Sequence, residues 1–214
     1  MSVRRGLDVV ALDGRRRLVE PPLRRQHPDD LEALLRRLQP DVVAIDSPPR
    51  WGVRGSSRKA ERDLRTLGVQ CFYTPSDEAR REEPFYEWMK VGHEAFEAAQ
   101  RAGYECSWGA DGPSGRALEV FPHGVAVALD GRLPPAGTTR RPAAKRRWRT
   151  EVLVRAGVDV GPLRTLDAVD AALAALMAVI VAEGGAWFWV GGPDEGCIVL
   201  PGARPAAGYP RPGG

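Results

Sequence analysis

Four acidic residues of this chain occupy positions where a carboxylate is costly unless it is used. Asp46 closes the apolar run VVAID, and Glu119 interrupts the short apolar segment ALEVF. Asp167 and Asp170 lie three residues apart at the start of a long apolar stretch, so they share one side of a helix. Asp167 also complements the dipole of a helix N-terminus, whereas Asp170 lies closer to the apolar stripe. Acids that converge from two strands and a helix could hold a divalent metal ion.

The chemistry that such acids suit is metal-dependent hydrolysis. Mg²⁺ prefers hard oxygen ligands and keeps water in its shell, so a few carboxylates suffice to bind it. Two such ions about 4 Å apart can activate a water and stabilise the leaving oxygen of a phosphodiester. The sequence has no Walker loop, no GxGxxG motif and no serine in a nucleophile elbow, and its three histidines fall in unrelated contexts. Any chemistry is therefore expected to depend on carboxylates.

Strands that alternate with helices must position these acids. Apolar runs that end at turn residues or prolines predict strands, namely 9–13, 42–46, 117–121, 187–190 and 197–200. Apolar residues at helical spacing, with capping residues and prolines at the ends, predict helices, namely 29–38, 56–67, 84–103, 142–156 and 165–183. This order predicts an α/β fold with a mainly parallel central sheet. The segment from about 50 to 110 has little strand signal and is expected to be a helical insertion.

The basic residues are almost all arginine. The chain of 214 residues carries a net charge of +3, with 28 arginines and only three lysines. Guanidinium groups bind oxyanions through two hydrogen bonds at once, although a coding bias also explains the excess. Six basic residues lie on or just before the helix expected from residue 142, namely Arg140, Arg141, Lys145, Arg146, Arg147 and Arg149. They favour either a solvated helix face or a contact with nucleic acid.

Several protein classes are disfavoured. The longest apolar run, 171–182, is too short to cross a bilayer, and the N-terminal residues do not form a signal peptide. Three cysteines that are far apart and odd in number indicate reduced thiols, without a disulfide framework or a zinc site. We therefore expect a cytoplasmic protein with one domain over 1–201. The Pro- and Gly-rich tail, 202–214, is expected to be disordered.

Several sequence blocks form a larger ordered pattern. They are VVAIDSPP, RKAERDLR, ALEVFPHG, the K-x-x-x-R-x-x-x-L helix of 145–153, DAVDAALAALMA and GPDEGCIVLP. In this order the blocks resemble the predicted-nuclease family called domain of unknown function 429, from about Leu7 to Pro201. The resemblance implies a ribonuclease H-like fold, with a central mixed sheet and flanking helices. The DxxDA helix is similar to the last helix of Holliday-junction resolvases of that superfamily.

The resemblance also implies an activity, which is metal-dependent hydrolysis of phosphodiester bonds. It places Asp46, Glu119 and Asp170 at the catalytic acid positions, where they would bind Mg²⁺ or Mn²⁺. Asp167 is expected to assist as a fourth metal ligand.

Basic residues in the same blocks are expected to hold the phosphates of the substrate. These residues are Arg58, Lys145 and Arg149, and the expected partner is nucleic acid, either DNA or RNA. An enzyme acting on another small phosphate-containing substrate is a further possibility, but no phosphate-binding glycine loop supports it.

The front of the chain departs from the family pattern. Proteins of this fold open with an apolar-Gly-Ile-Asp strand that carries the principal aspartate, whereas RRGLDVVALDG more closely resembles the segment after that strand. Either the first, central strand is missing, or Val9 to Asp13 is itself the first strand and Asp13 its terminal acid. Asp8 and Asp13 are therefore additional candidates. A missing aspartate would favour a second function, a non-catalytic module that binds nucleic acid or a protein.

Overall fold

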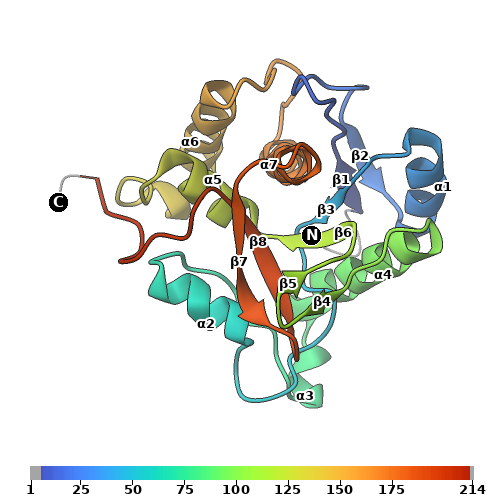
Figure 1. Cartoon of the computed structure of the whole chain (residues 1–214), viewed down its shortest axis with the longest axis vertical. Coiled ribbons are helices and arrows are strands. Elements are labelled where there is room, and N and C mark those ends of the chain that lie inside the picture. The colour runs from blue at the N-terminus through green and yellow to red at the C-terminus, as the bar shows by residue number, and fades with distance from the viewer. Residues whose placement is uncertain (1–5, 213–214) are drawn as a thin grey trace.

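The chain folds around a four-stranded sheet with the strand order β3-β6-β8-β7 (Figure 1). The computed structural model describes residues 6–212. β3 (Val43–Ile45), β6 (Ala117–Val120) and β8 (Gly196–Pro201) are parallel, and β7 (Trp187–Gly192) is antiparallel to β8. The prediction of an α/β protein is confirmed, and its sheet is mixed.

Seven α-helices of the described residues surround this sheet. They are α1 (Pro28–Leu38), α2 (Lys59–Thr66), α3 (Glu78–Arg81), α4 (Glu87–Arg101), α5 (Pro122–Asp130), α6 (Pro142–Arg155) and α7 (Leu166–Ala182). Short 3₁₀ helices occur at η1 (Pro84–Tyr86) and η2 (Thr138–Arg140). Between residues 6 and 212, no helix is both long and apolar enough to cross a membrane.

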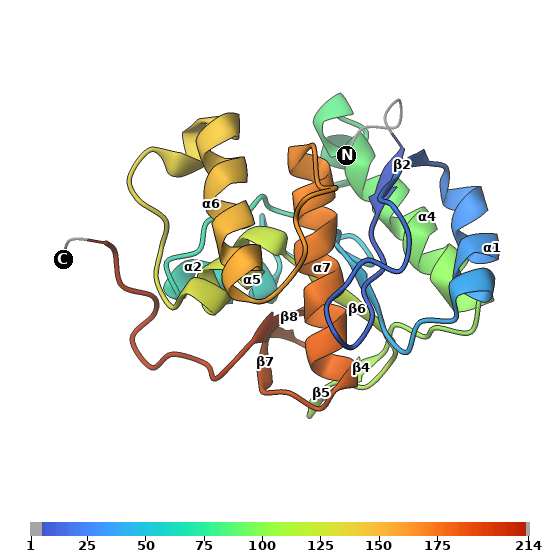
Figure 2. The same ribbon diagram turned by 90° about the horizontal axis from the view of Figure 1, so that it is seen from above.

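The two faces of the sheet carry different helices, as the alternation of side chains along β6 requires. Leu118 and Val120 pack into the larger apolar core, which contains the buried side of α7. Ala117 belongs to a second core with side chains of α1 and α4. Figure 2 shows α7 between α5 and α6 on one side and the β1–β2 hairpin and α1 on the other. Glu119 shares the face of Ala117, opposite to α7.

The first strand lies outside the central sheet. β1 (Leu7–Val9) pairs antiparallel with β2 (Leu23–Gln26) to form a separate two-stranded sheet. The strand was expected over Val9 to Asp13 but ends at Val9, because the chain then enters an irregular turn. Asp13 is exposed in this turn, where its Oδ1 accepts hydrogen bonds from the backbone N–H groups of Arg15 (2.9 Å) and Arg17 (2.8 Å). Asp8, rather than Asp13, is therefore the acid of the first described strand.

The segment between β3 and β6 adds no strand to the four-stranded sheet. It holds α2, α3, η1 and α4, followed by a hairpin of two very short strands, β4 (Trp108–Gly109) and β5 (Gly112–Pro113). After β8, the described part of the tail has no helix or strand. It lies along the molecule because Tyr209 N–H donates to the Leu67 carbonyl (3.0 Å) and Leu133 N–H donates to the Pro210 carbonyl (2.8 Å).

Helix α4 approaches the end of β3 closely at Gly92. A Cβ atom at this position would lie 1.7 Å from Ser47 Oγ and 2.2 Å from Ser47 Cβ. Ser47 is buried, and its backbone is fixed directly after β3, so relief of the clash requires the helix or the serine to shift. The glycine thus allows α4 to pack against the residue after Asp46.

Gly92→Ala is expected to lower the free energy of unfolding by about 1–3 kcal/mol, because the added methyl group overpacks this contact. The direction of the change in stability distinguishes the two cases, since Gly→Ala inside a helix otherwise stabilises the protein by about 0.5–1 kcal/mol. Urea denaturation of both proteins measures the difference. Gly109→Ala is the control, because a Cβ atom there meets nothing within 4 Å. An unchanged or increased stability of Gly92→Ala would contradict the close packing.

Candidate active site

A cavity of about 1010 Å³ lies between the β1–β2 hairpin, α7 and β3, and it reaches the carboxyl ends of β3 and β6. β1 and β3 both contribute to its wall, but among residues 6–212 no backbone hydrogen bond joins the two strands. The helix side of the cavity is formed by small residues of α7, such as Ala171 and Ala175. The same cavity therefore has an apolar wall and a group of charged side chains.

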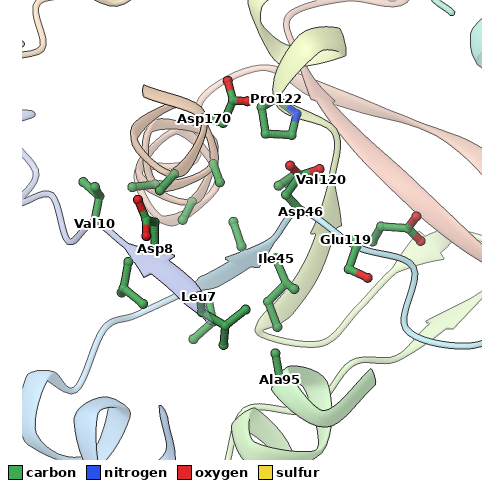
Figure 3. A pocket seen from close by; sticks show the side chains of 18 of the residues that line it. Leu7, Asp8, Val10, Ile45, Asp46, Ala95, Glu119, Val120, Pro122 and Asp170 are labelled. Atoms are coloured by element: carbon green, nitrogen blue, oxygen red, sulfur yellow. The ribbon is translucent and has the colours of Figure 1, made fainter. Parts of the chain in front are cut away.

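Asp46 and Asp170 form the acidic part of this cavity (Figure 3). Asp46 comes directly after the last residue of β3, and Asp170 lies in the second turn of α7. Burial, together with the negative charge of Asp170, raises the pKa of Asp46 to about 7. Burial also raises the pKa of Asp170, against the opposing effect of Arg149. Asp46 at the end of a strand and Asp170 in a helix were both predicted from the sequence, and the structure brings them together in one cavity.

Two cations lie beside these acids. Arg149 is buried and forms an ion pair with Asp170, and Lys145 lies one helical turn before it in α6. Burial, with the nearby Arg149, lowers the pKa of Lys145. Within residues 6–212 the Nε–H of Arg149 has no hydrogen-bond partner, although it is buried. A buried donor without a partner is costly, which indicates that this N–H group can donate a hydrogen bond to an oxygen atom of a ligand.

His123 completes this side of the cavity. It lies in the first turn of α5, directly after β6, and its ring contacts Trp148 edge to face with a centroid separation of 5.6 Å. Burial and the positive charge of Arg149 lower its pKa to about 3, so the imidazole is neutral near pH 7. Its Nδ1 atom is buried without a partner in the described part of the chain.

Asp167 and Asp8 also line the cavity. Asp167 precedes Asp170 by one turn of α7, and its charge contributes to the raised pKa of Asp170. Asp8 accepts a hydrogen bond from Arg25 N–H at its Oδ1 atom (3.2 Å), while its buried Oδ2 atom has no hydrogen-bond partner among the described residues. Figure 3 shows Asp8 on the β1 side of the cavity, across from Asp46.

Glu119 does not join this group, although it lines the same cavity. Its register partner on β3 is Ile45, so its side chain shares the face of Ile45 and lies opposite to that of Asp46 (Figure 3). There it receives two hydrogen bonds from the guanidinium of Arg58, including one of 2.8 Å from Nη1 to Oε2. Burial raises the pKa of Glu119, while Arg58 opposes that shift.

Arg58 is enclosed in a network of acids. Its Nε donates to Glu61 Oε1 (3.0 Å) and its Nη1 donates to the carbonyl of Glu195 (3.2 Å). The Glu61 carboxylate also accepts the backbone N–H of Thr74 (3.0 Å). Glu195 accepts N–H groups of Val53 (3.1 Å) and Lys59 (2.9 Å). Arg58 therefore ties α2 to β6 and to the β7–β8 turn, rather than presenting its charge to solvent.

Glu61 and Glu195 were not predicted from the sequence as parts of any site. The one available signal for Glu61 is its spacing, because Arg58 and Glu61 stand three residues apart where α2 begins, as in a capping box. Glu195 gives no such signal, since the turn that contains it comes from a distant part of the chain.

The donor set limits how a metal ion could be held. Among the residues that the structure describes, no group of three or more His, Cys, Asp or Glu side chains is arranged to hold a metal. Asp46 and Asp170 remain as two carboxylates with raised pKa values in one cavity. Two carboxylates fit an ion such as Mg²⁺, which keeps several waters and takes further ligands from substrate phosphates.

The fold and site define an α/β protein with an acid pair, a buried arginine and a partly buried lysine in a cavity at the strand ends. The chain belongs to the family described as protein of unknown function (DUF429), whose model matches residues 2–195. This assignment confirms the family resemblance of the sequence blocks. No curated protein and no solved structure matches the chain.

Proposed function

We propose that this protein is a metal-dependent nuclease that hydrolyses phosphodiester bonds of nucleic acid in the cavity around Asp46 and Asp170. The proposal depends on one observation, which is that two carboxylates of raised pKa lie beside Arg149 and Lys145. Acids at the end of a strand and in the last helix of a mixed sheet are consistent with the ribonuclease H-like fold. We assign that fold as part of the same proposal.

Asp46 and Asp170 would hold Mg²⁺ or Mn²⁺, with Asp167 as the nearest further carboxylate on α7. The ion supplies Lewis-acid stabilisation of the phosphoryl oxygens and lowers the pKa of a bound water. Because ionised carboxylates are the preferred ligands, Asp46 would have to give up the proton that its raised pKa favours in order to hold the ion. Asp170 has its counter-charge in Arg149, and this guanidinium would be free to pair with another anion if Asp170 held the ion.

The basic residues bind and orient the phosphate in this proposal. Arg149 and Lys145 lie one helical turn apart on α6 and line the same cavity as the two acids. A guanidinium can bind two phosphate oxygens at once, whereas the ammonium acts as a point charge. His123, neutral at physiological pH, has a buried Nδ1 without a partner among the described residues, and this atom could form a hydrogen bond that orients a water molecule. Arg58 acts at a distance by fixing Glu119 and the end of β6.

A second candidate function is a non-catalytic module that binds nucleic acid or a protein. The observation that favours it is the position of Glu119, which is neutralised by Arg58 on the opposite face of the sheet from Asp46. The two candidates differ in metal binding. A nuclease requires an acid pair that takes up the ion, and a binding module does not.

Calorimetric titration with Mn²⁺ and a cleavage assay together test the proposed function. We expect saturable heat with a dissociation constant of about millimolar or tighter, and proton release, because Asp46 must ionise to bind the ion. We also expect cleavage of at least one substrate in a set of single-stranded, duplex, hybrid and branched nucleic acids, and its loss in EDTA. Metal binding without any cleavage would contradict the nuclease, and the absence of both would favour the binding module.

A further inference from the structure

Three aromatic side chains gather at one end of the same cavity. Phe72 and Phe85 meet edge to face with ring centroids 5.3 Å apart, and Phe72 lies 6.4 Å from Trp88. All three line the cavity that holds Asp46 and Asp170. We refer to Phe72, Phe85 and Trp88 as the aromatic cluster.

The aromatic cluster is not part of the apolar core. Phe72 is 63% exposed and Phe85 is 52% exposed, whereas Phe96 of the same helical stripe is buried in the core around α1 and α4. Phe85 and Phe96 are both at helical spacing in this segment, but the structure turns only Phe85 outward. Burying a phenylalanine contributes about 1.5–3 kcal/mol, so leaving two exposed side by side forgoes stability. Exposed apolar patches beside a cavity are typical of a surface that meets a ligand.

Charge around the cluster is distributed unevenly. Glu82, Glu83 and Glu87 flank Phe85 and are exposed, while Lys90 and Arg80 pair with two of them. Because these cations are used in ion pairs, the rim carries no excess of positive charge that would attract a phosphate backbone. Among the cations that line the cavity, Lys145 and Arg149 lie next to the acid pair. A nucleotide chain with its phosphates near Lys145 and Arg149 would leave an uncharged base to approach the rings.

We propose that the aromatic cluster is a stacking platform for an unpaired base, so that the preferred substrate is single-stranded nucleic acid. This inference rests on the proposed function and specifies its substrate class. Base–aromatic stacking does not depend on base identity, because every base has a π-face. In a duplex the bases are already stacked on one another, so their faces are not available to the rings.

Fluorescence anisotropy in EDTA tests the platform without cleavage. The probes are a labelled oligothymidylate, an oligomer of equal length made of abasic nucleotides, and a duplex of the same length. Wild-type protein is expected to bind the oligothymidylate roughly 5- to 150-fold more tightly than the abasic oligomer, the range for one stacked base. Phe72→Ala/Phe85→Ala is expected to remove that difference and leave the abasic affinity unchanged. Phe72→Tyr/Phe85→Tyr retains the rings and is expected to retain the preference.

Matched variants separate stacking from charge and from folding. Lys145→Ala is expected to weaken binding of the oligothymidylate and the abasic oligomer by similar factors, since both carry the same phosphates. Val19→Ala/Val154→Ala removes two exposed apolar side chains elsewhere and is expected to change neither affinity. Thermal unfolding of each variant identifies any loss of folding, and the tyrosine pair keeps the test valid if the alanine pair is unstable.

The possible outcomes are distinct. Equal affinity for the base-bearing and abasic oligomers, a preference for the duplex, or no binding at all would overturn the platform. Base-dependent binding by a protein that cleaves none of the tested nucleic acids would support the platform and overturn the proposed hydrolysis. Cleavage of nucleic acid by a protein that binds the base-bearing and abasic oligomers equally would support the proposed hydrolysis and overturn the platform.

Discussion

Asp46→Asn is expected to abolish nucleic-acid cleavage while making the folded protein more stable above pH 7. The substitution removes one of the two carboxylates that would hold the metal. Loss of several kcal/mol of transition-state stabilisation corresponds to a decrease in rate of about 1,000-fold or more, at about 1.4 kcal/mol per factor of ten.

The stability change arises from the pKa of Asp46, which burial and Asp170 raise from 3.8 to about 7. A carboxyl with a raised folded-state pKa holds its proton more tightly when folded, so its ionisation opposes folding. Its contribution to stability is present below about pH 4, is lost as the pH rises towards 7, and stays lost above. Asparagine does not ionise, so the variant gains up to about 4 kcal/mol over wild type at pH 8 and little at pH 4.

Denaturant unfolding at pH 4, 6 and 8, beside the cleavage assay, measures both effects. Asp111→Asn is the matched control, because Asp111 is exposed between β4 and β5, outside the cavity. It is expected to change neither cleavage nor the pH dependence of stability. Activity retained in Asp46→Asn would exclude Asp46 as a ligand, and equal gains at all three pH values would exclude its ionisation as the cause.

Of the single substitutions in the network around Arg58, Arg58→Met is expected to be the most destabilising. It is expected to lower the free energy of unfolding by about 3–5 kcal/mol. The side chain of Arg58 is 2% exposed, and those of Glu61 and Glu119 are 3% and 4% exposed. Methionine fills much of the same volume but leaves two buried carboxylates without a counter-charge. The cost arises mainly from these unpaired charges, and only partly from lost hydrogen bonds.

Adding Glu119→Gln to Arg58→Met is expected to recover part of the loss, since it removes one of the unpaired charges. Lys59→Met is the matched control at the neighbouring residue, because its ion pair with Asp63 is on the surface and is expected to contribute less than about 1 kcal/mol. Urea unfolding of the four proteins provides the comparison. A loss for Arg58→Met no larger than that for Lys59→Met would show that the network does not stabilise the fold.

The sequence predicted the acid pair because both signals were local. Asp46 ended an apolar strand and Asp170 stood in an apolar helix, and both positions are unusual for a carboxylate. Glu119 gave an equally strong signal, but its face of the sheet depends on register. A shift of one residue reverses the direction of every side chain on a strand, and the register with β3 cannot be obtained from ALEVF alone.

Contacts between residues that are distant in the chain could not be predicted from local sequence patterns. Arg58 meets Glu119, 61 residues away, and the Glu195 carbonyl, 137 residues away. Arg58 stands in a basic block and resembled a phosphate ligand, because only Glu61, of the acids that enclose it, is close to it in the chain. The extent of the helical insertion and the long α7 could be predicted from periodicity and capping residues, which act over a few residues only.

The cavity between β1 and β3 also separates the β1–β2 hairpin from the four-stranded sheet, so the hairpin can detach while the sheet stays folded. Among the strands that the structure describes, β1 pairs with β2 alone, so detachment of residues 7–26 breaks no hydrogen bond of the four-stranded sheet. The free energy of that local opening depends on side-chain contacts, whereas β6 and β8 lie at the centre of the sheet and open only with global unfolding. We therefore expect the wall that carries Asp8 to open at a lower free energy than the strands at the centre of the sheet. Such an opening would widen the cavity beside Asp46 and Asp170 without unfolding the sheet.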